Sequence, residues 1–311
     1  MNRWQSDLYR KYGRVATQIA ADLLALRPGD RIPRVQDYAR RCETGNGTVQ
    51  NALRSLIEAG AVQVEARGHK GTFLVQADYR KLREIAGLAS LLGLMPLPYT
   101  RRYEGLASGL YEAVRQSDLP FSIGYMRGAR NRVAALHRGQ ADFAVLSRLS
   151  AELAVAEGGV VIVMGLGPQT FVSQHGILLA RPEYTGITDG MRVGIDPQTL
   201  DQAWLTAEEC RGRQVELVEI PYSHLLQRLR EGQIDAAIWN LDELSSGTME
   251  IYSRPLQSPE ARRIAESSSE AVLVIDANRP DLERLLPEII DPALVRRVQN
   301  EVLEGKRIPS Y

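Results

Sequence analysis

The feature that most constrains the fold is a ten-residue repeat in the second half of the chain. LHRGQADFAV (136–145) aligns with LREGQIDAAI (229–238), 93 residues further on. Each copy is typical of a helix end, a capping glycine and an aspartate that leads into a buried strand. A strand, a polar loop and a helix precede each copy, with the strands expected at 121–126 and 215–220. The repeat predicts two similar α/β lobes, and the alternation of strands and helices predicts parallel sheets.

Length and composition narrow the protein class. A chain of 311 residues is longer than one hydrophobic core usually supports, so we expect two or three domains. No apolar run approaches the roughly 20 residues of a membrane span, and the first residues lack a signal peptide's apolar stretch. Cys42 and Cys210 lie far apart, which argues against a disulfide framework or a zinc site. We therefore expect a cytoplasmic protein without membrane association, metal or cofactor.

Charge is unevenly distributed along the chain. Residues 1–78 contain 12 Lys and Arg against 8 Asp and Glu, whereas residues 79–311 contain 26 against 30. A basic N-terminal segment on an acidic body is typical of a polyanion-binding module joined to a second domain.

Apolar spacing in the first 78 residues predicts three helices followed by a hairpin. We expect the helices at about 8–26, 35–42 and 48–59, with a break at 27–30 and a tight turn at 44–47. Asn46 is the expected N-cap of the third helix, and Gly60 ends it. Two short strands, 62–65 and 72–75, flank a basic, glycine-rich link. This pattern is typical of a β-hairpin wing.

The polar face of the third helix predicts DNA binding. Opposite its apolar stripe it carries Gly47, Thr48, Gln50, Asn51 and Arg54, and no acid before Glu58. Thr, Gln, Asn and Arg pair with base edges and phosphates in the major groove. The alternative is a solvated face, which usually carries Glu and Lys at a spacing of four.

The N-terminal segment resembles the GntR family of winged-helix regulators. The matching residues are GDRIP (29–33), Ala39, TVQNAL (48–53), Leu56, Gly60 and GHKGTF (68–73). The resemblance implies that DNA faces Arg34, Asn46, Thr48, Gln50, Asn51 and Arg54, and that Arg67, His69 and Lys70 lie near the minor groove or its phosphates. The family's recognition helix often begins with arginines. Here it begins Asn46-Gly47-Thr48 with Gln50 in place of a frequent Arg, which removes one or two cationic contacts.

The two-lobed pattern is similar to the type 2 periplasmic-binding-protein fold, which also forms the effector domain of many LysR-type regulators. Longer motifs are similar to the YhfZ family of bacterial regulators. They are MPLPYTR (95–101), YEGLASGL (103–110), MRGA (126–129), VLSRL (145–149), LGP (166–168), DAAIWN (235–240) and PSY (309–311). With the winged helix-turn-helix head, this resemblance covers nearly the whole chain.

The expected fold is therefore α/β, with a GntR-like winged helix-turn-helix and a two-lobed effector-binding domain. We place the DNA-binding domain at 1–78, a helical linker at 79–94 and the effector-binding domain at 95–311. Lobe I comprises 95–180 and 271–311, and lobe II comprises 181–270, with the chain crossing near 177–180 and returning through 271–275. The Leu- and Ala-rich linker, a helix over 77–93, could form a dimer interface or pack on its own domain.

Strand ends mark the expected ligand cleft, because ligands of open α/β sheets bind beyond the carboxyl ends of strands, near helix N-termini. The candidate residues are Tyr99, Thr100, Arg101, Tyr125, Arg127, Gly128, Ser147, Arg148, Gln174, Asp196, Gln198, Thr199, Tyr222 and Asn240, with His175 and Ser223 in the same loops. Thr100 is an expected N-cap, and Thr199 with Gln202 fits a capping box. The arginines and helix N-termini favour an anionic ligand, a carboxylate or phosphate.

Structural alternatives exist for these residues. Arg148 can pair with Glu152, Arg101 can lie on the surface, and a tryptophan such as Trp239 is more often core than a stacking platform. We therefore expect a ligand cleft from these residues as a group rather than from any one of them.

Two other function classes stay open beside a regulator. The body could be a small-molecule enzyme, or it could only dimerise. No H-E-x-x-H, G-x-S-x-G or P-loop motif is present, GLGP (165–168) lacks a dinucleotide site's third glycine, and Ser173 with His175 is a weak nucleophile–base pair. We therefore expect no enzyme, but a homodimer that binds an inverted-repeat DNA operator. A small, anionic effector between the lobes would control its operator affinity.

Overall fold

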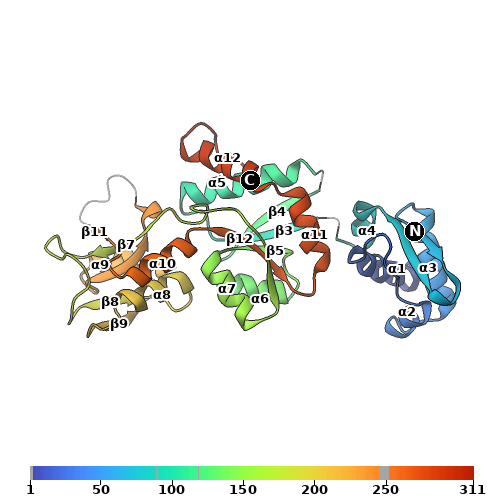
Figure 1. Ribbon diagram of the computed structural model, residues 1–311, viewed down its shortest axis with the longest axis horizontal. Coiled ribbons are helices and arrows are strands. Elements are labelled where there is room, and N and C mark those ends of the chain that lie inside the picture. The colour runs from blue at the N-terminus through green and yellow to red at the C-terminus, as the bar shows by residue number, and fades with distance from the viewer. Residues whose placement is uncertain (1–2, 89, 118, 245–251) are drawn as a thin grey trace. The chain divides into compact units, whose positions relative to one another are not determined.

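The computed structural model describes residues 3–88, 90–117, 119–244 and 252–311. The chain forms two compact units, Met1–Leu91 with Arg279–Asp281, and Leu92–Asn278 with Leu282–Tyr311. Each unit (Figure 1) has its own core of buried hydrophobic residues. Among the described residues, no helix is long and apolar enough to cross a membrane. Parts of the sequence predictions fall on residues 1–2, 89, 118 and 245–251, which lie outside the described residues.

The first unit is a winged helix-turn-helix, as predicted. Its elements are α1 (Arg3–Leu24), α2 (Val35–Arg41), α3 (Asn46–Glu58), β1 (Val62–Ala66), the 3₁₀ turn η1 (Gly68–Lys70), β2 (Thr72–Ala77) and α4 (Tyr79–Ile85). The apolar stripe of α3 packs with α1, so Val49 and Leu56 are buried beside Leu23. β1 and β2 pair antiparallel, and an isolated antiparallel bridge joins Arg31 to Phe73 of β2.

Two local predictions for this unit are wrong. Gly45, not Asn46, is the N-cap of α3, because the helix begins at Asn46. The predicted helical connector over 77–93 is only half helical, because α4 ends at Ile85 and a strand begins at Leu91. Leu82 of α4 is fully buried in the core of the winged helix. This part of the connector therefore packs on its own unit.

The second unit contains two five-stranded sheets of equivalent strand order, flanked by helices (Figure 1). The sheet of lobe I is ordered β4-β3-β5-β12-β6, and that of lobe II is ordered β9-β8-β10-β7-β11. The lobe I strands are β3 (Leu91–Met95), β4 (Phe121–Tyr125), β5 (Phe143–Ser147), β6 (Val160–Gly165) and β12 (Ala271–Asp276). The lobe II strands are β7 (His175–Leu179), β8 (Arg192–Ile195), β9 (Glu216–Glu219), β10 (Ala236–Asn240) and β11 (Tyr252–Pro255).

The helices of the second unit connect these strands. They are α5 (Arg101–Arg115), α6 (Ala129–His137), α7 (Arg148–Glu157), α8 (Leu200–Glu209), α9 (Tyr222–Arg230), α10 (Pro259–Ser268), α11 (Pro280–Ile289) and α12 (Pro292–Leu303), with a short 3₁₀ turn η2 (Leu241–Glu243) after β10. α6 precedes β5 in lobe I just as α9 precedes β10 in lobe II, which confirms the predicted duplication.

The repeated aspartates make the same contact with a backbone amide in both lobes. A carboxylate oxygen of Asp142 accepts a hydrogen bond from the Leu92 amide at 2.9 Å, and Asp235 accepts one from the Arg192 amide at 2.9 Å. Gly139 and Gly232 end the preceding helices with φ of 64° and 66°. Because these left-handed turns favour glycine, each repeat joins a helix end to the start of a central strand.

The sheets are mixed rather than parallel, and the chain passes from lobe I to lobe II earlier than predicted. β12 pairs antiparallel with β5 and β6, and β7 pairs antiparallel with β10 and β11. Residues 177–180 were assigned to lobe I, but β7 lies in the lobe II sheet, so the chain crosses between β6 and β7. A fully buried apolar run fits either sheet, and its partner is set by non-local pairing that periodicity does not report. The return into lobe I through β12 is as predicted.

Gly93 offers a test of how tightly lobe I is packed. A Cβ atom at Gly93 would lie 2.4 Å from the Phe143 ring on the neighbouring strand. We expect Gly93→Ala to lower the free energy of unfolding by about 1–3 kcal/mol, because an added methyl group overpacks the core. Urea denaturation followed by circular dichroism measures it.

Gly47→Ala is the matched control. No atom lies within 4 Å of the corresponding Cβ position at this helical site. Its stability should equal or slightly exceed that of the wild type. Equal stability of the Gly93→Ala variant and the wild type would contradict the packing described for β3 and β5.

Candidate functional site

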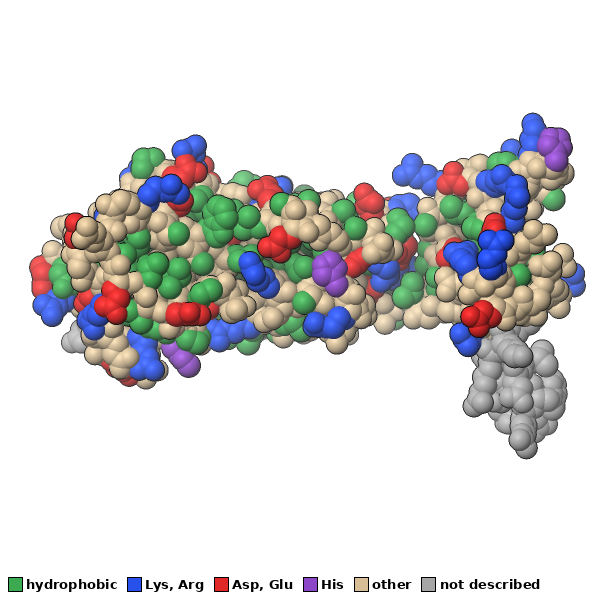
Figure 2. Space-filling view, turned by 90° about the horizontal axis from the view of Figure 1, so that it is seen from below, with side chains coloured by type: hydrophobic (Ala, Val, Ile, Leu, Met, Phe, Trp, Pro, Cys, Tyr) green, Lys and Arg blue, Asp and Glu red, His purple; other side chains and the backbone are tan. Residues whose placement is uncertain are grey.

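The exposed face of α3 presents the residues predicted to bind DNA. Asn46, Gln50, Asn51 and Arg54 are exposed, and Thr48 is half-buried. The opposite face of the helix carries the buried apolar stripe, so this polar face cannot serve the core. Lys and Arg side chains lie close together on this unit (Figure 2).

The wing carries further cationic groups. Arg67, His69 and Lys70 are all exposed on the turn between β1 and β2. Arg67 pairs with Glu65 at 2.7 Å and its guanidinium lies 4.7 Å from the centre of the Phe73 ring. Arg34, Arg54 and Lys70 make no ion pair with any other described residue. Among the cationic residues predicted to contact DNA, these three therefore have no carboxylate partner in the described chain.

A cavity of about 110 Å³ lies where strands of both lobes end. Its walls come from the loops after β3, β4 and β10 and from the N-terminal ends of α8 and α9. Six of the fourteen predicted ligand residues line it: Tyr99, Arg127, Gly128, Thr199, Tyr222 and Asn240. His175, from a loop singled out in the sequence, lines it too.

Three of the other predicted ligand residues stabilise helices and strands of the lobes. The Thr100 hydroxyl caps α5 by accepting a hydrogen bond from the Tyr103 amide at 3.1 Å, as predicted. Ser147 caps α7, and its hydroxyl donates to Asp201 at 2.8 Å. Arg148 pairs with Glu270 at 2.5 Å and, more distantly, with Glu152 at 3.8 Å. These side chains bond to other residues of the chain and do not line the cavity.

Asp196 organises the loop before α8 instead of lining the cavity. Its carboxylate accepts hydrogen bonds from the Gln198 amide, the Thr199 hydroxyl and the Tyr222 amide, at 3.0, 3.0 and 2.8 Å. The predicted capping box is wrong: Thr199 donates to Asp196, and Gln202 accepts from the Asp196 amide at 2.8 Å.

The remaining predicted positions lie elsewhere. Arg101 is exposed, Tyr125 packs against Tyr311, and Gln174 lines a second cavity, formed by the crossover segment and α10. Trp239 is core, as expected, and its ring is stacked on Tyr222 at 4.2 Å.

Arg132 is the principal cavity residue that the sequence predictions missed. It is only 4% exposed, and its guanidinium donates to the carbonyl oxygens of Val145 and Met126 at 3.1 and 2.7 Å. Burial lowers its pKa to about 10, so it stays charged at neutral pH. Its signal in the sequence is a charged residue in the apolar stripe of α6, beside Ala129 and Ala135.

Two carboxyl groups also line the cavity, and the sequence predictions missed both. Burial raises the pKa of Asp201 to about 6, although hydrogen bonds from Ser147 and Ser150 lower it. Burial raises the pKa of Glu243 to about 7, while its hydrogen bond from Tyr222 lowers it. Burial lowers the pKa of His175 to about 4, so this ring is neutral at pH 7.

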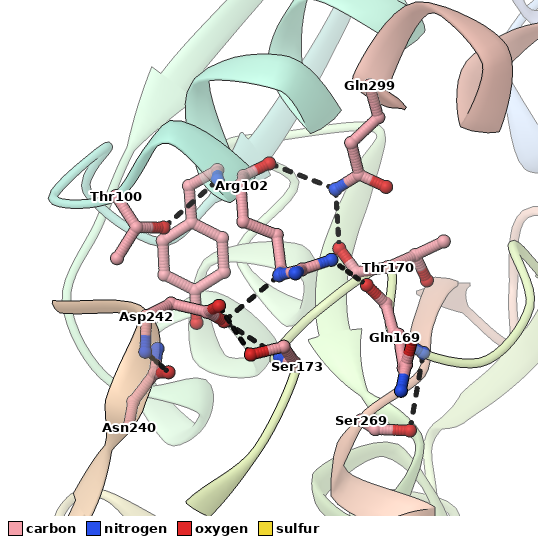
Figure 3. A network of polar contacts seen from close by, with 10 residues as sticks. Thr100, Arg102, Gln169, Thr170, Ser173, Asn240, Asp242, Ser269 and Gln299 are labelled. Atoms are coloured by element: carbon pink, nitrogen blue, oxygen red, sulfur yellow. Dashed lines mark hydrogen bonds and ion pairs between the residues drawn. The ribbon is translucent and has the colours of Figure 1, made fainter. Parts of the chain in front are cut away.

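A hydrogen-bond network beside the cavity ties lobe II to lobe I (Figure 3). Arg102 of α5 donates to Asp242 of η2 at 3.0 Å and to the carbonyl oxygen of Gln169. Asp242 also accepts from the Ser173 amide at 2.7 Å and from the Ser173 hydroxyl. Gln299 of α12 donates to the Arg102 and Thr170 carbonyl oxygens at 2.9 and 2.8 Å. Arg102, the neighbour of the predicted ligand residue Arg101, therefore joins the end of β10 to the crossover segment.

The raised pKa of Glu243 predicts a pH dependence of stability. Its folded-state pKa lies above the ordinary glutamate value, so the folded protein loses stability as pH rises from about 4.5 through 7. Glu243→Gln should remove this loss. We expect the variant to gain on the order of 1–3 kcal/mol relative to wild type between pH 5 and pH 8. Urea denaturation at both pH values, with the exposed Glu219→Gln as control, measures it; parallel wild-type and Glu243→Gln curves would contradict the burial of a charge here.

Comparison with known proteins identifies both parts of the chain. Residues 27–74 match a family model described as a helix-turn-helix domain, and residues 78–311 match the YhfZ C-terminal domain. The uncharacterized protein YhfZ of Escherichia coli (strain K12) is 35% identical over 303 residues, which cover 97% of this chain and 98% of that protein.

Solved structures agree with the fold. The crystal structure of YhfZ from Shigella flexneri superposes with a TM-score of 0.61 and 34% identity, covering 72% of this chain and 94% of that one. The periplasmic aliphatic sulphonate binding protein SsuA from Escherichia coli superposes with a TM-score of 0.52 and 16% identity, covering 70% of this chain and 74% of that one, and shares the fold. A helix-turn-helix head and a two-lobed, periplasmic-binding-protein-like body are thus present in one chain. The chain belongs to the YhfZ family.

Proposed function

We propose that this chain is a sequence-specific transcription regulator whose affinity for its DNA operator is controlled by a small molecule bound between its two lobes. The observation that carries the proposal is the pairing, in one chain, of an exposed, acid-free recognition face on α3 with a cavity at the strand ends of a two-lobed fold. Helix-turn-helix proteins place such a face in the major groove.

The DNA contacts divide into two kinds. Thr48, Gln50 and Asn51 carry the donors and acceptors that read base edges. Arg34, Arg54 and Lys70 are cations with no ion pair in the described chain, and they supply phosphate contacts. His69 and Arg67 lie on the same wing, where Arg67 is already paired with Glu65.

We further propose that two copies act together. A homodimer presents two α3 helices to an inverted repeat, whose half-sites lie roughly 34 Å apart, one helical turn of DNA. Ligand binding then alters how the two heads fit the operator, a coupling typically on the order of 1–3 kcal/mol.

The cleft favours an effector over a substrate. Arg127 and Arg132 line it and suit a carboxylate or phosphate group. The weak nucleophile–base pair noted in the sequence is not formed, because the Ser173 hydroxyl bonds to Asp242 and His175 Nδ1 has no hydrogen-bond partner among the described residues. This arrangement fits a binding protein better than a hydrolase.

Arg54→Ala tests the phosphate contacts. We expect weaker binding to every DNA sequence and a salt dependence of log K shallower by about one unit, because one phosphate contact is lost. Fluorescence anisotropy across a salt series measures it, with sites selected from a random library by the wild-type protein and with scrambled DNA. Arg101→Ala, which removes an exposed arginine of the other unit, is the control. Wild-type affinity and salt slope in Arg54→Ala would place the docking face elsewhere.

Gln50→Ala tests base reading. Loss of one side chain that contacts a base edge should reduce discrimination at one position of each half-site by about 1–3 kcal/mol. Non-specific affinity should stay unchanged, because glutamine carries no charge. Repeating the library selection with the variant measures this; an unchanged selected sequence would exclude Gln50 from readout.

A further inference from the structure

We propose that the cleft selects a ligand that carries both a carboxylate and an ammonium group, with the carboxylate on Arg132 and the ammonium on Glu243. This inference rests on the proposed function, since it assigns the chemistry of the effector. It extends the expectation of a simple anion, because the cavity holds acidic as well as basic side chains.

Arg132 is a preorganised carboxylate anchor. Two backbone carbonyl oxygens hold its Nε and Nη1, so the guanidinium has a fixed position. Nη2 has no hydrogen bond to any described residue, and Arg132 makes no ion pair within that part of the chain. A buried guanidinium without a paired anion is unfavourable. The Asp201 carboxylate acts on Arg132 without forming an ion pair, so a ligand carboxylate in the cavity supplies both the paired anion and the missing acceptor.

Glu243 is the corresponding group for a cation. Its Oε1 accepts one long hydrogen bond, 3.3 Å, from the Tyr222 hydroxyl, which in turn accepts from the Asn240 amide at 3.1 Å. Oε2 has no hydrogen bond to a described residue. The adjacent Asp242 is already paired with Arg102, whereas Glu243 has no such partner in the described chain. An ammonium group beside Glu243 would neutralise this half-buried carboxylate.

The two charges face one cavity from different lobes. Arg132 lies on α6 of lobe I, and Glu243 on η2 of lobe II. Both act on Tyr103, which lines the same cavity: burial raises the pKa of its hydroxyl, the Glu243 carboxylate raises it further, and the Arg132 guanidinium lowers it. A ligand with opposite charges at its two ends therefore contacts both lobes at once, which neither a simple carboxylate nor a simple amine does.

The cavity also limits the ligand's size. At about 110 Å³ it is smaller than the roughly 150 Å³ cavity that accommodates benzene. A small amino acid has both charged groups within that volume.

The test uses matched triplets of compounds and the full-length protein. Each triplet contains a small amino acid, the acid that lacks its amino group and the amine that lacks its carboxylate, for example alanine, propionate and ethylamine. Glycine, serine, β-alanine and both enantiomers of alanine complete the set. Isothermal titration calorimetry should detect at least one amino acid that binds saturably. Its two partial analogues should bind about ten- to a hundredfold more weakly, because each lacks a charged hydrogen-bonding group.

Glu243→Gln assigns the ammonium subsite. Its affinity for the amino acid should fall at least tenfold, while its weak affinity for the matching acid stays unchanged. The exposed Glu219→Gln should bind as the wild type does. Circular dichroism confirms that the variants are folded.

Other outcomes separate the two proposals. If acids or phosphorylated sugars bind as tightly as any amino acid, or if Glu243→Gln leaves amino-acid affinity unchanged, the ammonium subsite is wrong and the effector cleft stands. If no amino acid, acid, amine or sugar phosphate gives heat or a concentration-dependent rise in melting temperature, both the subsite and the effector function are overturned.

Discussion

The structure of the second unit depends on one interaction that occurs twice. In each lobe an aspartate after a glycine-capped helix binds the amide that begins the neighbouring strand, Asp142 to Leu92 and Asp235 to Arg192. This contact sets the register of β5 against β3 and of β10 against β8, so these parallel strands end at a common edge in each lobe. Because both edges border the same cavity, the duplicated hydrogen bond from aspartate to strand amide positions Tyr222, Asn240 and Arg127 around it.

The cavity is unusual because charged side chains that line it have no ion-pair partner among the described residues. Elsewhere in the two lobes, charged side chains are paired within the protein, as Arg102 with Asp242 and Arg148 with Glu270. Arg132 and Glu243 instead keep hydrogen-bonding capacity that described residues do not satisfy. Burying such groups costs stability unless a partner compensates them. Their position in a cleft between lobes indicates that the partner is a ligand.

The sequence predicted most of what local periodicity can report. The buried and exposed faces of α3 follow from its apolar spacing, and the repeat follows from identical turn chemistry in both lobes. The lobe to which β7 belongs could not be predicted, because its partners are distant in the chain. At the cleft, strand ends were the right region, but Ser147 and Arg148 proved to hold helix caps and ion pairs. Arg132 was missed because a helix interior position carries no strand-end signal, although an arginine in an apolar stripe could have revealed it.

The most direct test of the central claim is reciprocal linkage between the cleft and the operator. Operator affinity is measured by fluorescence anisotropy with and without a saturating cleft ligand, and ligand affinity is measured by calorimetry with and without operator DNA. We expect both dissociation constants to change by the same factor, about 5- to 150-fold, because binding free energies are coupled reciprocally. Operator affinity that stays constant while the cleft is saturated would show that the lobes do not control the DNA-binding head.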